Sequence, residues 1–322
     1  MEIIDMKIFI KQIIKIICLI ICFIIIDFSI YMTFTRVYKN DISPEMQAKS
    51  IELSEYLPFS DDSKVVKIEH SDLIGELPVI DGAAALYPVF SGFVGSLYPE
   101  YSVSFDGENF TQNSKLQYTN TRGAYKAIVD GTVDMIFCAK PSKEQEEYAK
   151  AHNVELEYVP IGKEAFVFIV NKGNSVNNLS LEDIKNIYAG NIKNWKKVGG
   201  ENLPINAIQR NVGSGSQTTM LKLMGGTPIR PYILGFAGKS IGFSFRYYVE
   251  GIVENGAIKM ISVNGVYPNK ENIENNLYPL TSEFYAIYNK SNTNPNIQNL
   301  IDFILSEDGQ SIVEKSGYVK VK

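Results

Sequence analysis

The stretch with the strongest chemical character is "QRNVGSGSQTTMLKLM". Gly213 and Gly215 allow the backbone to turn tightly and to bring its N–H groups close to a ligand. Ser214 and Ser216 add hydroxyl donors, and a helix expected to begin near Ser216 adds unpaired N–H groups and the positive end of its dipole. Arg210 supplies a fixed cation. Together these groups predict a cradle for an anion. The alternative is a glycine-rich loop with a serine cap and no ligand.

Two other segments have the same character. "IDGAAALYPVF" places Gly82 and three alanines between an expected strand and a helix that begins near Ala85. "NTRGAYKAI" places Thr121, Arg122 and Gly123 at the start of another expected helix. Three helix N-termini with small residues, two of them beside an arginine, favour one shared anion site over three unrelated caps.

Strands and helices that alternate along the chain must position these loops. The expected strands include "TVDMIFCA", "VELEYVPI" and "EAFVFIVNK", and the expected helices include "ALYPVFSGFVGSLYP", "AYKAIVDG" and "SKEQEEYAKAHN". In "LSLEDIKNIYAG", Ser180 is the expected cap, with Asp183 at the capping-box position and Gly190 as the stop. In "NPNIQNLIDFIL", Asn294 is the expected cap and Pro295 the first helical residue. This alternation predicts an α/β fold with mainly parallel sheets.

Composition excludes several classes of function. The chain has 322 residues, of which 45% are hydrophobic and 21% charged, as in ordinary globular proteins that have room for two domains. A net charge of −5 argues against a nucleic-acid partner. His70 and His152 lie in no nucleophile motif, and no Cys, His and carboxylate cluster has metal-ligand spacing. We therefore expect no catalytic residue, metal or cofactor, and we expect Cys138 to be a small buried residue.

The N-terminus has the layout of a secretory signal or a membrane anchor. Three lysines precede "IICLIICFIII", and "FSIYMTF" extends the apolar run to about twenty residues, roughly the length that crosses a bilayer. No A-x-A-like cleavage site follows, so we expect residues 1–36 to remain as an anchor with the rest of the chain outside the cytoplasm. Acylation at Cys22 is the alternative. Residues 37–76 are polar and mixed in charge, and we expect a linker there.

From about Leu77 to the C-terminus, the chain resembles the substrate-binding proteins of phosphate ABC transporters, which have the type II periplasmic-binding-protein fold. Five blocks in the same order carry this resemblance: "EAFVFIVNKGNSVNNLSLEDIKNIYAGNIKNWKKVGG", "LPINAIQRNVGSGSQTTMLKLM", "SIGFSFRYY", "IKMISVNGVYPNKENIENNLYPLTSEFYAIY" and "IDFILSEDGQSIVEKSGYV". It implies two α/β lobes, joined by crossing hinge strands, that close on a ligand. By this resemblance, lobe one covers residues 77–160 and 263–322, and lobe two covers residues 161–262.

The resemblance also implies a metal-free oxyanion site made of backbone amides, hydroxyls and one arginine. The residues implied to bind the anion are Ala84, Ala85, Leu86, Thr121, Arg122, Arg210, Ser214, Gly215 and Ser216. The second-lobe motif matches the family well. The first-lobe loop matches less well, because Ala83, Ala84 and Ala85 stand where family members often have Ser or Thr, so this loop offers only backbone donors.

A further departure lies in "FCAKPS", where better-known family members have an acidic residue that accepts the proton of the ligand. This chain has Cys138, Ala139 and Lys140 there, and no carboxylate. We therefore expect weaker discrimination between phosphate and sulfate, unless another acceptor takes this place. Arg122 would add positive charge and could favour a dianion or a larger organic anion.

The sequence therefore predicts a membrane-anchored, extracytoplasmic binding protein that is not an enzyme. It would capture a small oxyanion, phosphate by the resemblance, and deliver it to an ABC permease and its ATPase. The alternative is a membrane-anchored sensor or envelope interaction module whose ligand is altered or lost. The three alanines and the missing carboxylate favour that alternative, whereas the intact Arg210, Ser214 and Ser216 cradle argues against it.

Overall fold

The computed structural model describes residues 14–17, 19–30, 51–230, 239–253 and 256–321. The chain divides into two compact units, Met1–Pro44 and Glu45–Lys322. In the first unit, the described residues are helical and exposed. Within the described ranges, no helix combines the length and the apolarity needed to cross a membrane. The predicted anchor, residues 1–36, lies partly outside the described residues.

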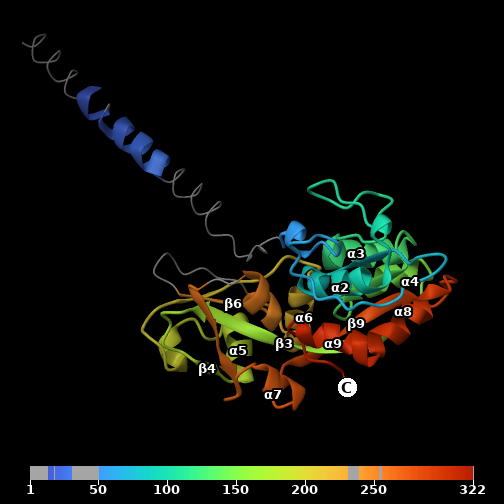
Figure 1. Ribbon diagram of the computed structural model, residues 1–322. Helices are drawn as coiled ribbons and strands as arrows, with labels where there is room; N and C mark the ends of the chain where they lie inside the picture. Colours follow the sequence, from blue (N-terminus) through green and yellow to red (C-terminus); the bar gives the residue numbers. More distant parts are fainter. Residues whose placement is uncertain (1–13, 18, 31–50, 231–238, 254–255, 322) are drawn as a thin grey trace, which may run out of the picture. The chain divides into compact units, whose positions relative to one another are not determined.

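The second unit is built on a seven-stranded sheet with the strand order β1–β2–β9–β3–β6–β5, and β7 pairs with β3 (Figure 1). The strand bounds are Ile80–Gly82 for β1, Met135–Cys138 for β2, Leu156–Asn171 for β3, Ile205–Ala207 for β5, Lys239–Phe245 for β6, Ile258–Met260 for β7 and Thr281–Asn289 for β9. A separate two-stranded parallel sheet pairs β4 (Asn178–Leu179) with β8 (Ser262–Val263).

The sheet is mixed, and the prediction of mainly parallel sheets is wrong. β1 pairs with β2 and β5 pairs with β6 in parallel. Every described pairing of β3 and β9 is antiparallel. A local pattern identifies a strand from its own residues, but the direction of its partners depends on long connections that the pattern does not contain.

Helices cover the sheet, as the ribbon shows (Figure 1). The α-helices are α2 (Tyr87–Leu97), α3 (Asn120–Val129), α4 (Lys143–Ala151), α5 (Leu181–Tyr188), α6 (Gly215–Met224), α7 (Lys270–Glu274), α8 (Asn296–Leu305) and α9 (Glu307–Lys315). The shorter helical turns are η1 (Leu53–Tyr56), η2 (Ala84–Leu86), η3 (Glu100–Ser102), η4 (Trp195–Val198) and the π-helix η5 (Tyr248–Val253).

Helix caps mostly confirm the sequence signals. At α5, the hydroxyl of Ser180 accepts a hydrogen bond from the Asp183 N–H, and the Asp183 carboxylate completes the capping box. At α8, the expected start is one residue early, because Pro295 is the cap and Asn296 the first helical residue. Asn294 still contributes, since its side-chain oxygen accepts from the Asn296 N–H at 3.0 Å.

β3 links the two halves of the unit. Its first residues pair with β9, and its last residues pair with β6 and β7. We predicted two separate strands here, but the structure has one strand of 16 residues with a register shift between Pro160 and Gly162. Gly162 is needed at this bulge, because a Cβ atom there would lie 2.2 Å from the ring of Phe284.

Separate hydrophobic cores define two lobes. The first lobe packs α2, α8 and α9 in one core and α3 and α4 in another. The second lobe packs α5, α6 and α7 with β5 and β6 in a core of its own. Val263, Ile273 and Tyr278 belong to this second core, so the predicted lobe boundary at residue 263 is wrong. The second lobe extends further because β8 pairs with β4 and α7 packs against β3.

Residues 51–76 fold against α2 and do not form the predicted linker. Ile51, Leu53 and Tyr56 are buried in the first-lobe core. The N–H of Leu73 donates to the carbonyl of Leu97 at 2.8 Å. These apolar residues are too widely spaced to show a regular period, but together they cover one face of a helix that is apolar on nearly all sides.

Candidate functional site

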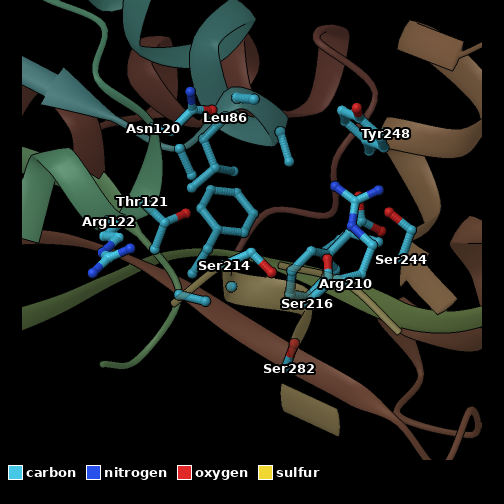
Figure 2. Close-up of a pocket in the computed structure, with 18 of the residues that line it drawn as sticks. Leu86, Asn120, Thr121, Arg122, Arg210, Ser214, Ser216, Ser244, Tyr248 and Ser282 are labelled. Carbon is cyan, nitrogen blue, oxygen red and sulfur yellow. The ribbon is translucent and has the colours of Figure 1, made fainter. Parts of the chain in front are cut away.

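A cavity of about 260 Å³ lies where the N-terminal ends of η2, α3 and α6 meet (Figure 2). All nine sequence-predicted residues line it, namely Ala84, Ala85, Leu86, Thr121, Arg122, Arg210, Ser214, Gly215 and Ser216. The first five belong to the first lobe and the last four to the second. The structure therefore brings three distant segments together at one place, and their role in anion binding stays a prediction.

The second-lobe wall of the cavity is the N-terminus of α6. Ser214 is the N-cap, and its hydroxyl accepts a hydrogen bond from the N–H of Gln217 at 3.2 Å. Gly213 has a φ of 80°, in the left-handed region that glycine adopts at little cost. Gly215 and Ser216 follow, and the backbone N–H groups at a helix start have no intrahelical partner. These groups and the helix dipole favour an anion at this end of the cavity.

Arg210 supplies a buried positive charge to the same wall. Its guanidinium lies over the ring of Tyr248, 5.6 Å from the centroid. Its backbone N–H donates to Gln217 Oε1 at 2.9 Å, which fixes the residue against α6. Among the described residues, no carboxylate lies within ion-pair distance of Arg210. A buried charge in a protein is normally paired, so this guanidinium is suited to an external anion.

The first-lobe wall has two parts, η2 and the start of α3. The alanines of η2 present no side-chain donor, and the hydroxyl of Tyr318 donates to the carbonyl of Ala85 and holds this turn. At α3, Asn120 has a φ of 63°, and the Thr121 side chain that follows is buried. Figure 2 shows the hydroxyl of Thr121 on the side of the cavity that faces the second lobe. This wall therefore offers backbone N–H groups and one hydroxyl.

Arg122 occupies the rim of the cavity. Its side chain is 74% exposed and lies 4.0 Å from Glu144 Oε1. Figure 2 shows its guanidinium on the opposite side of the cavity from that of Arg210 and directed away from it. Arg122 therefore contributes charge at the entrance, and it does not form a second buried cation beside Arg210.

Sequence reasoning missed several polar residues that line the cavity. Ser244 on β6 and Tyr248 on η5 lie near Arg210, and Ser282 on β9 lines another part of the cavity (Figure 2). Ser244 and Ser282 lie within the quoted blocks "SIGFSFRYY" and "NNLYPLTSEFYAIY", so the signal was present. Neither serine lies in a glycine-rich turn at a helix start, the feature that identifies the other site residues from the sequence.

Two carboxylates line the cavity from elements other than the "FCAKPS" strand. Glu164 on β3 is buried, and it accepts from Arg246 Nε at 3.2 Å and from the Tyr247 N–H at 3.1 Å. Burial raises the pKa of Glu164 above its usual value, and the charge of Arg246 opposes this effect. Glu283 on β9 accepts from the Tyr285 hydroxyl at 2.8 Å. At the expected position, Ala139 lines the cavity and Cys138 is fully buried.

The described lining of the cavity contains no histidine. Neither His70 nor His152 lines it, so neither can activate Ser214 or Ser216 as a nucleophile. Across the described ranges, no group of three or more His, Cys, Asp or Glu residues is arranged to hold a metal ion. The groups that converge there are one buried cation, several hydroxyls, two carboxylates and the N-terminal ends of η2, α3 and α6.

Comparison with known proteins adds the family. Residues 79–308 match a family model described as a PBP superfamily domain. The phosphate-binding protein PstS of Borreliella burgdorferi is 27% identical over 186 residues, which cover 49% of this chain and 64% of that protein. The phosphate-binding protein PstS of Bacillus subtilis is 29% identical over 167 residues, which cover 47% of this chain and 53% of that protein. The matched segments thus span about half to two thirds of these two relatives.

Two solved structures share the fold. One, from Clostridium perfringens, is assigned as a phosphate ABC transporter substrate-binding protein and holds bound phosphate; it has a TM-score of 0.57, 24% identity, and coverage of 79% of this chain and 100% of that chain. The other is an ABC-type phosphate transport receptor from Vibrio cholerae, with a TM-score of 0.53, 19% identity, and coverage of 74% and 98%. At these identities the likeness concerns the fold alone.

Proposed function

The chain belongs to the PBP superfamily, and we propose that it captures inorganic phosphate between its two lobes outside the cytoplasm and delivers it to an ABC permease and ATPase. The observation that carries this proposal is Arg210, a buried guanidinium without a carboxylate partner in the described chain. Hydroxyls and helix N–H groups surround the same cavity. Arginine and N–H donors together match the oxygens of a tetrahedral oxyanion.

Phosphate is favoured over sulfate by the carboxylates of the cavity and by the relatives. A carboxylate accepts the proton of hydrogen phosphate, whereas it repels fully ionised sulfate. Glu164 and Glu283 line the cavity from other strands, and we propose that one of them takes the place of the carboxylate that "FCAKPS" lacks. The relatives from Borreliella burgdorferi and Bacillus subtilis are phosphate-binding proteins.

We extend the proposal to the N-terminus. Residues 1–36 would anchor the chain in the membrane with the lobes on the extracytoplasmic side, as the lysines and the apolar run indicate. Acylated Cys22 would serve the same purpose. Membrane fractionation of the full chain tests this: an anchored chain stays with the membrane after a high-salt wash and is released by detergent. Release of the full chain by salt alone would contradict it.

Ligand-induced stabilisation tests the capture of phosphate. The full chain, freed of bound anion, is unfolded by heat in increasing phosphate and, separately, in sulfate. A ligand present at a hundred times its Kd stabilises the native state by about 2.7 kcal/mol. We expect this stabilisation with phosphate and its loss in Arg210→Ala.

The matched control is Arg230→Ala, which removes the same charge from an exposed position outside the cavity lining. This variant should respond to phosphate as the wild type does. Equal stabilisation by phosphate and sulfate would indicate a relaxed oxyanion site. No response to either anion would contradict capture and favour a sensor or interaction module.

A further inference from the structure

One buried carboxylate, Asp81, joins the two first-lobe parts of the cavity. Asp81 lies on β1 and has no exposed surface. Its Oδ1 accepts from the N–H of Gly82 at 2.7 Å and from the N–H of Thr119 at 2.8 Å. Its Oδ2 accepts from the hydroxyl of Thr119 at 2.5 Å. Gly82 leads directly into η2, and Thr119 is the N-cap of α3.

The contact with Asp81 also changes what Thr119 does for α3. A threonine at the N-cap normally accepts a hydrogen bond from the helix N–H groups. Thr119 makes no such bond, and its hydroxyl donates to Asp81 instead. Gly123 allows this arrangement, since a Cβ atom there would lie 2.5 Å from the Thr119 side chain. The first N–H groups of α3, beside Thr121, therefore stay available to a ligand.

We propose that Asp81 is a positioning residue that holds η2 and the start of α3 in the arrangement that binds the anion, without touching the anion itself. Asp81 is not among the residues that line the cavity, whereas residues on both sides of its contacts are. This inference rests on the proposed capture of phosphate.

The charge of Asp81 couples this role to pH. The titratable groups that face it are Tyr118, next to Thr119, and Cys138 on β2, and no cation is paired with it in the described chain. Burial raises the pKa of Asp81 to about 6, although its hydrogen bonds with Thr119 and Gly82 lower it. A bound anion adds a second negative charge nearby, so binding favours protonated Asp81. Affinity should therefore fall as the pH rises above about 6.

Two substitutions at Asp81 distinguish the effect of its hydrogen bonds from the effect of its charge. Asp81→Asn imitates the protonated carboxyl, because its oxygen can accept both N–H groups and its amide can donate to the Thr119 hydroxyl. Asp81→Ala removes all three contacts. Calorimetric titration of the full chain with phosphate, from pH 5 to pH 8, measures both. Phosphate changes its own ionisation in this pH range, but that effect cancels in the ratio of the variant's phosphate affinity to that of the wild type.

We expect Asp81→Ala to weaken phosphate binding about ten- to hundredfold at pH 5, because two buried N–H groups and a hydroxyl lose their acceptor. Asp81→Asn should match the wild type at pH 5 and bind more tightly than the wild type at pH 8. Asp134→Ala is the control. Asp134 accepts from the Val79 N–H at 2.8 Å, a similar clamp at the other end of β1, and its loss should leave phosphate affinity unchanged.

Hydrogen exchange without phosphate distinguishes failure of this inference from failure of phosphate capture. The amides of Gly82 and Thr119 should exchange faster in Asp81→Ala, whatever the ligand. If that variant does not fold, Thr119→Val removes the hydroxyl contact alone, and Thr119→Ser should restore wild-type affinity. Unchanged phosphate affinity in Asp81→Ala would overturn the proposal. So would a ratio of phosphate affinities, Asp81→Asn to wild type, that does not vary with pH.

Discussion

The two buried arginines of the second lobe differ in their partners. Arg246 contacts Glu164 and Glu250, whereas Arg210 lies over Tyr248 and contacts no carboxylate in the described chain. Desolvating a charge is costly unless a partner offsets it. The anion-free protein is therefore less stable than it would be with an uncharged side chain at this position. Binding sites often lower the stability of a protein in this way.

Replacement of Arg210 by an apolar residue should separate stability from binding. Arg210→Met keeps the length of the side chain and removes the unpaired charge, so the anion-free protein should gain about 1 kcal/mol of unfolding free energy. The same variant should lose phosphate binding. Urea unfolding without phosphate measures the first effect, with exposed Arg230→Met as the control. Destabilisation of the anion-free protein by several kcal/mol would show that the contact of Arg210 with Tyr248 outweighs the cost of burying the charge.

At the scale of one element, the N-terminal end of helix α6 both carries the capping residue and forms a wall of the cavity. Ser214 performs both tasks, because its hydroxyl caps the helix and its residue lines the cavity. Ser216 lines the cavity but is not the cap. The two serines should therefore respond differently to removal of the hydroxyl.

Ser214→Ala should cost about 1 kcal/mol of stability and also weaken phosphate binding. Ser216→Ala should weaken binding with a stability change of less than about 0.5 kcal/mol. Denaturant unfolding and calorimetry of both variants check this. Equal losses of stability in the two variants would mean that the cap contributes little.

Glu164 on β3, the strand that links the two lobes, forms a buried ion pair with Arg246, which directly follows β6. Arg246→Met leaves Glu164 buried without its cation, and breaking such a pair costs about 3–5 kcal/mol. The double variant Glu164→Gln with Arg246→Met removes both charges, and it should recover a large part of this loss. Unfolding free energies of the two variants test the coupling. A double variant no more stable than Arg246→Met would exclude it.

Local signals in the sequence predicted individual helix starts well. They did not predict how strands pair or how distant segments pack together. Ser180 and Asp183 identified the start of α5, and the glycines and serines around Ser214 identified the start of α6. All nine predicted site residues line one cavity. The antiparallel pairing of β3 and the packing of residues 51–76 depend on distant partners. Asp81 was missed for the same reason, because its partner Thr119 lies 38 residues along the chain.

At the scale of the whole second unit, the two lobes contact each other beside the cavity. Lys222 Nζ on α6 donates to the carbonyl of Pro141 at 3.0 Å, and the backbone of Gly213 lies against the side chain of Arg122. These contacts join the second lobe to the first. They should therefore close the cavity over a bound anion and slow its release.

Removal of the Lys222 contact should loosen this closure. Lys222→Ala should raise the rate of phosphate release and weaken affinity about two- to tenfold, with little change in stability. Stopped-flow release of phosphate measures the rate. Lys143→Ala is the control, because the Lys143 side chain is 89% exposed and forms its ion pair with Glu147 on the same helix. An unchanged release rate in Lys222→Ala would place the closing contacts elsewhere.

The most direct test of the account is calorimetric titration of the full chain, freed of bound anion, with inorganic phosphate. The wild type should bind one phosphate per chain with a Kd in the micromolar range or below. Arg210→Ala should release no binding heat, although it stays folded. Absence of binding heat in the wild type, or unchanged binding in Arg210→Ala, would contradict the assignment of this cavity as a phosphate site.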